Sequence, residues 1–490
     1  MITIEDVKRM AQAGGYKRIP ISRELYADQR TPVEVLKILS GVSSDCFLFE
    51  SGEDITEWGR YTYLGFQPAM KLTCKDGAVT ITGGKREKVK EADSPKEVIR
   101  QILKDYRSPK PAGMPGFTGG LAGYFSYGYM KYGKGMPEPA KGEGGDFPDA
   151  YLMLFDQVIA FDRFRQKVLL IANADTADLE AGYVEAERKL DEMEKLIRHG
   201  EGKAKEGLHL KDELKPFFDQ EDYSLMAEMC REYIRSGDSF WMVLANGLEG
   251  EMEGSLLDLY RVLRANSPSP YLFYLSGDGR EIAGTAPGTF VKLEKEKLSA
   301  TVMTAKGSRG ESRKEEFRLE RELLADEGQR AWHNLLVDLA RNDLSQACRS
   351  NTVRLEPYLG IGRQDHGICL ASAASGRIAR GWDGLDAVEA FLPGGKFVGA
   401  PKAKNGRLLG EIEQKDRGLF GGAIGYLDFS GNMDLCAPEQ LACVKEGHLT
   451  LQAGIQLKGD GEPERAWQQW EEQASSLLYA LEIARKGEEL

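Results

Sequence analysis

Arg417-Gly-Leu-Phe-Gly-Gly-Ala-Ile-Gly-Tyr426 mixes glycine with apolar and aromatic residues, and Gly116-Phe-Thr-Gly-Gly-Leu-Ala-Gly-Tyr-Phe-Ser-Tyr127 shows the same mixture earlier in the chain. Neither segment has the Gly-x-Gly-x-x-Gly spacing of a dinucleotide-binding loop that precedes a helix. Glycine within an apolar run is typical of strands whose backbones approach each other closely. Both segments are therefore predicted to be close-packed strands.

Around these segments, the composition is that of a large globular protein. The 490 residues are 41% hydrophobic and 29% charged, which is enough for two domains or one composite domain. The 65 basic and 77 acidic residues give a net charge of −12, so a nucleic-acid or anionic-membrane partner has no electrostatic support. No apolar run approaches the ~20 residues that span a bilayer. We expect a cytoplasmic protein that binds small molecules or other proteins.

The chain divides into three regions by composition. Region 1–197 mixes helices with strands such as Cys46-Phe-Leu-Phe-Glu50 and Lys167-Val-Leu-Leu-Ile-Ala172. A charged, glycine-containing linker is predicted over 198–220. Region 221–490 then alternates helices with glycine-punctuated strands. We therefore predict two sequence regions joined by an exposed connection.

The clearest helix is predicted over the closing segment from Pro463 to Lys486, because its apolar residues recur at spacings of three and four. These residues are Trp467, Trp470, Ala474, Leu477 and Leu481. Such a stripe is more typical of a core-facing helix than of a ligand-binding surface.

Further motifs share their order and spacing with a known enzyme family. They are Phe47-Leu-Phe-Glu-Ser51, Gly59-Arg-Tyr-Thr-Tyr-Leu-Gly65, Asn266-Ser-Pro-Ser-Pro-Tyr-Leu-Phe273, Gly284-Thr-Ala-Pro287, Val337-Asp-Leu-Ala-Arg-Asn-Asp343 and Gly399-Ala-Pro-Lys402. With the two glycine-rich strands, they resemble anthranilate synthase component I over nearly the whole chain. The resemblance extends to the aminodeoxychorismate, isochorismate and salicylate synthases of the same chorismate-utilising family.

The resemblance implies an α/β fold of the α+β type, in which a large antiparallel β-sandwich is covered by helices and the two sequence halves interleave. Region 1–197 would be the N-terminal part of the anthranilate branch, and 221–490 its chorismate-binding part. It also implies a glutamine amidotransferase partner, since this chain has no Gly-x-Cys-x-Gly nucleophile motif of its own. A homo-oligomer is the alternative assembly.

The resemblance also aligns the family's general acid and metal ligands with residues that lack their chemistry. Gly288 stands where the family has its general-acid glutamate, and it has no proton to give. Trp332, beside the retained His333, replaces one glutamate of the magnesium site, and Gln469 replaces the other. Because magnesium requires oxygen ligands in near-octahedral order, we expect no metal and no cofactor. Magnesium would be needed only if the conventional chemistry survives.

Other substrate-binding positions are altered as well. Gln440 aligns with a carboxylate-binding arginine, and Gln456 aligns with a glycine that lets the backbone meet the substrate. Losing a charged arginine contact forfeits roughly 1.5 to 3 kcal/mol per hydrogen bond. Cys369 aligns with the histidine beside the leaving hydroxyl, and Trp241 with the residue that handles water. The altered positions together favour loss of the family's usual reaction.

Three functional hypotheses follow. In the first, the chain is a pseudoenzyme that binds a small molecule, regulates a partner, or does both. Its motivation is the survival of segments that form the amino-acid feedback site in the anthranilate branch. The candidate amino-acid-binding residues are Glu50, Ser51, Pro270, Tyr271 and Phe273. The plainer alternative is that these residues are a buried strand end and a carboxylate held by neighbouring groups.

In the second hypothesis, the old cavity serves a new lyase or transferase that uses Lys306 and Lys396, because a desolvated lysine can become nucleophilic. The same lysines would alternatively bind an anionic metabolite. The candidate pocket residues are Lys306, Lys396, Gln456, Lys458, His366, His333 and Glu439. In the third hypothesis, the chain is an active anthranilate or aminodeoxychorismate synthase component I that depends on chorismate, magnesium and an amidotransferase.

Overall fold

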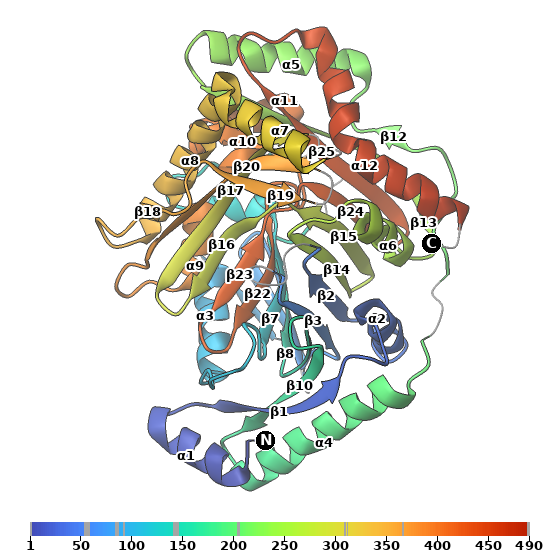
Figure 1. Ribbon diagram of the computed structural model, residues 1–490, viewed down its shortest axis with the longest axis vertical. Coiled ribbons are helices and arrows are strands. Elements are labelled where there is room, and N and C mark those ends of the chain that lie inside the picture. Colours follow the sequence, from blue (N-terminus) through green and yellow to red (C-terminus); the bar gives the residue numbers. More distant parts are fainter. Residues whose placement is uncertain are drawn as a thin grey trace.

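The computed structural model describes residues 2–52, 59–83, 88–91, 94–140, 147–202, 206–307, 310, 312–364 and 367–487. Two large sheets dominate this part of the chain, and every strand pair in them is antiparallel. Helices cover their outer faces (Figure 1). The predicted class, a large antiparallel β-sandwich covered by helices, is confirmed.

The first sheet contains strands from both ends of the sequence. Its order is β1 (Arg18–Tyr26), β10 (Lys167–Asp175), β9 (Gln157–Asp162), β3 (Tyr61–Phe66), β2 (Cys46–Glu50), β14 (Tyr271–Gly277), β15 (Arg280–Ala286), β24 (Gln440–Lys445), β25 (His448–Leu457), β13 (Trp241–Glu253) and β11 (His209–Leu210), with β12 (Lys215–Pro216) and β21 (Gly399–Ala400) also paired to β13. The predicted strands over 46–50 and 167–172 are both present.

The second sheet is interleaved in the same way. Its order is β18 (Arg354–Leu355), β20 (Gly367–Arg377), β17 (Lys297–Gly307), β16 (Thr289–Glu294), β23 (Met433–Cys436), β22 (Ala423–Asp428), β7 (Gly120–Phe125), β8 (Ala150–Phe155), β4 (Met70–Lys75), β5 (Ala78–Thr82) and β6 (Lys88–Glu91), with β19 (Gly360–Gln364) on β20. Regions 1–197 and 221–490 therefore share both sheets. The boundaries of these regions remain sequence-based predictions.

The two glycine-rich segments form β7 and β22, which lie next to each other, as their close-packed sequence predicts. Gly123 pairs with Gly425 across the two strands, and both have φ near 150°. A Cβ atom on Gly123 would lie 2.0 Å from the carbonyl oxygen of Tyr151. Glycine is therefore required where these strands meet their neighbours.

The helices complete the layers. They are α1 (Ile4–Gly14), α2 (Pro32–Ser40), α3 (Pro95–Asp105), α4 (Leu179–His199), α5 (Gln220–Arg235), α6 (Leu257–Asn266), α7 (Arg313–Ala325), α8 (Glu327–Ala347), α9 (Gly384–Phe391), α10 (Gly395–Val398), α11 (Lys402–Glu413) and α12 (Ala466–Lys486), with short 3-10 turns at Tyr127–Tyr132 and Pro463–Arg465. In Figure 1, α1 and α4 lie at one end beside β1, and α5 and α11 lie at the other. The predicted closing helix is confirmed as α12.

An aromatic-rich core fills the space between the sheets. Phe47, Phe117, Phe155 and Phe273 are all buried in it. A second cluster lies between the first sheet and the helices α2, α4, α6 and α12. No helix among the described residues is both long and apolar enough to span a membrane.

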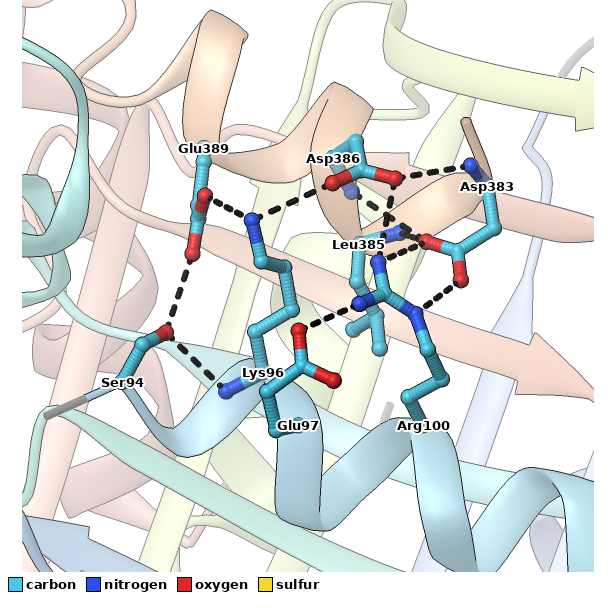
Figure 2. A network of polar contacts seen from close by, with 8 residues as sticks. All are labelled: Ser94, Lys96, Glu97, Arg100, Asp383, Leu385, Asp386 and Glu389. Carbon is cyan, nitrogen blue, oxygen red and sulfur yellow. Dashed lines mark hydrogen bonds and ion pairs between the residues drawn. The ribbon is translucent and has the colours of Figure 1, made fainter. Parts of the chain in front are cut away.

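An ion-pair network joins α3, from the first half of the chain, to α9, from the second (Figure 2). Lys96 Nζ lies 2.6 Å from Glu389 and 3.1 Å from Asp386. Arg100 pairs with Asp386 and with Asp383, the residue that caps the start of α9. Burial disfavours the charged form of Lys96, but its hydrogen bonds to the two carboxylates outweigh this effect and raise its pKa. The contacts fix the interleaved halves to each other.

Candidate functional site

A cavity of about 960 Å³ lies where β13, β15, β24 and β25 of the first sheet approach β17 and β20 of the second. Side chains from α5, α8, α10 and α12 also line it. Its size is that of a small-molecule site. It collects eight of the residues singled out from the sequence, namely Trp332, Cys369, Lys396, Glu439, Gln440, Gln456, Lys458 and Gln469.

Trp332 forms an apolar part of the cavity wall. Its ring lies edge to face with the ring of Trp241, with 4.8 Å between the centroids. Trp241 is buried behind it in the inter-sheet core. The Lys458 ammonium lies 5.2 Å from the centroid of the Trp332 ring, within the range of a cation–π contact. The side chain in this part of the wall is therefore an indole, whereas a magnesium site requires oxygen ligands such as carboxylates.

Gly288 lies beside the main cavity and lines a smaller one of about 90 Å³. The two cavities share five lining residues, namely Pro287, Met303, Leu336, Lys396 and Phe397. A Cβ atom on Gly288 would lie 2.5 Å from the Thr301 hydroxyl oxygen. Thr301 therefore occupies the space through which a longer side chain at this position would have to pass.

Lys396 is held by an ion pair rather than left as an isolated amine. Its Nζ lies 2.9 Å from the Glu439 carboxylate. Next to Glu439, the Gln440 side-chain oxygen accepts a hydrogen bond of 3.3 Å from the Thr285 hydroxyl. Because this ion pair already engages the Lys396 amine, Lys396 is better placed to bind a ligand than to attack one.

The strand segment Ala453-Gly-Ile-Gln456 passes along the cavity on β25. A Cβ atom on Gly454 would lie 2.6 Å from the ring of Phe420, which also lines the cavity. Gln456 is opposite Val243 in the pairing with β13. The backbone of this segment therefore lies along the cavity, and the side chain of Gln456 adds an amide group to the cavity wall.

His333 is buried behind the cavity wall and both ring nitrogens are engaged. Nδ1 lies 2.6 Å from the hydroxyl of Thr304, and Nε2 lies 2.7 Å from the hydroxyl of Ser372. Thr304 itself lines the cavity. Burial lowers the pKa of His333 to about 4, so the ring is neutral and acts as a support for Thr304.

The depressed pKa of His333 predicts a pH-dependent loss of stability. In the unfolded chain this group titrates near 6.5, whereas in the folded protein its pKa is about 4. Between these values the unfolded state binds one more proton, so stability falls as the pH drops from 6.5 to 4, by at most about 3 kcal/mol. Urea unfolding across this range should show a shallower pH dependence for His333→Gln. Identical pH dependence of the two proteins would contradict this assignment.

The described residues contain no group of three His, Cys, Asp or Glu side chains arranged to hold a metal ion. Among the described residues, three acidic side chains line the cavity: Glu439 is paired with Lys396, and Asp460 and Glu472 are exposed. With Trp332 and Gln469 also in the wall, this set of side chains does not fit a magnesium site built on two carboxylates.

Two sequence-predicted pocket residues lie wholly or partly outside the described part of the structure. His366 falls outside the described residues. The backbone of Lys306 belongs to β17, but its side chain is not among those described. Their roles stay predictions from the sequence.

The candidate amino-acid-binding residues are divided between two faces of the first sheet. Glu50 is opposite Leu272 in the pairing of β2 with β14, and its carboxylate accepts hydrogen bonds from Tyr260 and Arg264 of α6. Tyr271 reaches Asp434 of the second sheet with a hydrogen bond of 2.7 Å, and Phe273 lies in the inter-sheet core. Ser51 and Pro270 are buried at the ends of the two strands.

The sequence reasoning missed three charged residues among the described part of the cavity wall: Asp460 and Glu472, which are exposed, and Arg231 on α5, which is buried. The buried face of α5 comprises Tyr223, Met226, Ala227, Cys230 and Arg231. These positions follow the i, i+3, i+4, i+7, i+8 pattern of a core-facing stripe. An arginine at the last position of such a stripe was the available signal.

Comparison with known proteins gives consistent matches over the whole length. The family described as chorismate binding enzyme matches residues 44–479. Anthranilate synthase component 1 of Acetivibrio thermocellus is 32% identical, with 98% of each chain aligned, and that of Acinetobacter calcoaceticus is 31% identical, with 97% of each aligned.

Solved structures agree with these sequence matches. Anthranilate synthase component I from Streptococcus pneumoniae superposes with a TM-score of 0.75 at 26% identity, covering 87% of this chain and 93% of that one. The menaquinone-specific isochorismate synthase from Escherichia coli has a TM-score of 0.69 at 15% identity, with 98% of each chain covered, and shares the fold.

Proposed function

Because this chain belongs to the chorismate binding enzyme family, we propose that it is a catalytically degenerate relative of anthranilate synthase component I that binds a small molecule in its central cavity. The observation that carries the proposal is the wall formed by Trp332, which is packed against Trp241 and covered by Lys458. An indole can bind a ligand by stacking, but it cannot coordinate magnesium.

Other side chains of the cavity support a binding role. Gln440, Gln456 and Gln469 offer neutral amides, which donate and accept hydrogen bonds but do not transfer protons. Lys396, which a new lyase or transferase would use, is neutralised by Glu439 at 2.9 Å. The cavity is therefore better suited to holding a ligand than to acid-base or covalent catalysis.

An assay with chorismate, ammonia and magnesium tests the catalytic part of the proposal. We expect no fluorescent anthranilate above the enzyme-free background. The Acetivibrio thermocellus relative, whose name is anthranilate synthase component 1, serves as the positive control. Anthranilate formation by this chain under conditions in which the control is active would refute the proposal.

The second candidate function is that of an active anthranilate or aminodeoxychorismate synthase component I. The full-length identity of 32% to an anthranilate synthase component 1 favours it. It requires magnesium bound without the carboxylates that the resemblance implies, and the same assay decides between the two candidates.

The protein partner that we propose is a glutamine amidotransferase subunit or a second copy of this chain. Sedimentation of the purified chain with and without an amidotransferase tests this proposal.

Amino-acid binding at the Glu50 region is a separate proposal. The Glu50 carboxylate is already bound by Tyr260 and Arg264, so an amino-acid ligand would have to compete with these groups. Calorimetry with tryptophan tests this site, and the absence of heat at millimolar tryptophan would remove it. We place the principal ligand in the central cavity instead.

A further inference from the structure

Arg231 is a buried cation of the cavity wall. Only 1% of its surface is exposed, yet it lines the cavity from α5. Among the described residues, its Nε and Nη1 atoms have no hydrogen-bond partner. The nearby Glu228 is instead bound to Arg235, at 2.7 Å. An unpaired buried guanidinium is costly, and in a native protein it calls for an explanation.

Arg231 differs from the other charged residues that line the cavity. Lys396 and Glu439 neutralise each other, and Lys458, Asp460 and Glu472 are exposed to solvent. Solvent screens exposed charges, so they bind an ion weakly. Arg231 is thus the one fully buried charge among the described side chains of the cavity wall, where an electrostatic contact is strongest.

The backbone packs closely against one side of this guanidinium, and both line the cavity. Gly461, in the turn after β25, lies so close that a Cβ atom on it would be 2.9 Å from Arg231 Nη2. Gln469 and Gln473 of α12 line the same cavity, and their amides can donate further hydrogen bonds to an oxyanion.

We infer that Arg231 is the anchor of an oxyanion subsite, and that the cavity ligand carries a carboxylate or phosphate group bound there. This inference rests on the proposed function, because it names the chemical class of the molecule held in the same cavity. Guanidinium groups match both oxyanions in charge and geometry. Burial also lowers the pKa of Arg231, because it disfavours the charged guanidinium. A bound anion would offset this effect.

Calorimetric titration of the full chain with inorganic phosphate and, separately, with chorismate tests the subsite. We expect at least one of these probes to bind saturably, and Arg231→Met to weaken that binding about 10- to 100-fold. Binding of chorismate alone would identify a carboxylate site, and binding of phosphate a phosphate site. Arg235→Met on the same helix is the matched control and should bind as the wild type does, since Arg235 is exposed and paired with Glu228.

Thermal unfolding without added anion separates a binding role from a structural one. If Arg231 serves a ligand, Arg231→Met removes an unpaired buried charge, and the Tm should be equal to or above that of the wild type. A lower Tm for Arg231→Met than for Arg235→Met would show a structural role and overturn the inference. Chorismate binding that Arg231→Met leaves unchanged would also overturn it, while the proposed function would survive. No saturable binding of either probe would refute the oxyanion subsite, and the anthranilate assay would still judge the proposed function independently.

Discussion

Arg417→Met is expected to lower the free energy of unfolding by about 3 to 5 kcal/mol, because it leaves the Glu413 carboxylate buried without its counter-ion. Both side chains are only 3% exposed. Arg417 also donates hydrogen bonds of 2.7 Å to the carbonyl oxygens of Phe397 and Val243, two residues that line the cavity. Burial opposes the charge on Arg417, but Glu413 outweighs this effect, so the pKa is raised.

Urea unfolding of four proteins measures this effect. Arg417→Met/Glu413→Gln should be more stable than Arg417→Met alone, because the double variant leaves no unpaired carboxylate. Arg341→Met removes an exposed ion pair with Asp338 and should leave the unfolding midpoint close to that of the wild type. If Arg417→Met unfolds at the wild-type midpoint, the buried pair does not support the cavity wall.

Trp241→Ala is expected to lower the free energy of unfolding by about 3 to 5 kcal/mol, because it removes a large side chain from a packed core. Trp241 is 1% exposed and supports Trp332 through an edge-to-face contact of 4.8 Å. The cavity left behind would let Trp332 move away from the ligand site.

Trp241→Phe is the matched control for this substitution. Within the described part of the chain, the indole nitrogen of Trp241 has no hydrogen-bond partner, so phenylalanine loses packing volume but no polar contact. We expect Trp241→Phe to cost less than half as much as Trp241→Ala in chemical unfolding. Wild-type stability of Trp241→Ala would show that Trp332 does not depend on this contact.

The fold class was predictable from the family resemblance, and the glycine-rich segments by themselves predicted two close-packed strands. Gly123 and Gly425 meet in adjacent strands, as such segments require. The apolar stripe of α12 was equally readable. The order of strands was not, since β2 and β14 pair across nearly half of the chain, and periodicity within a segment says nothing about such distant partners.

The site was predictable in part. The resemblance to the family predicted that Trp332, Gln440 and Gln469 belong to one site, and all three line the cavity. It did not reveal that Glu50 faces α6 while Tyr271 faces the second sheet, because the strand pairing decides these directions. Arg231 was missed because the helical stripe around it looks like ordinary core.

A crystal structure of the full chain soaked with chorismate and magnesium would show whether the family's cavity persists without its magnesium-dependent chemistry. We expect any electron density in the cavity to belong to an organic anion held beside Trp332 and Arg231, with no divalent ion on acidic side chains. A magnesium ion coordinated by two carboxylates of this chain, with the ring carboxylate of chorismate as a further ligand, would contradict this expectation.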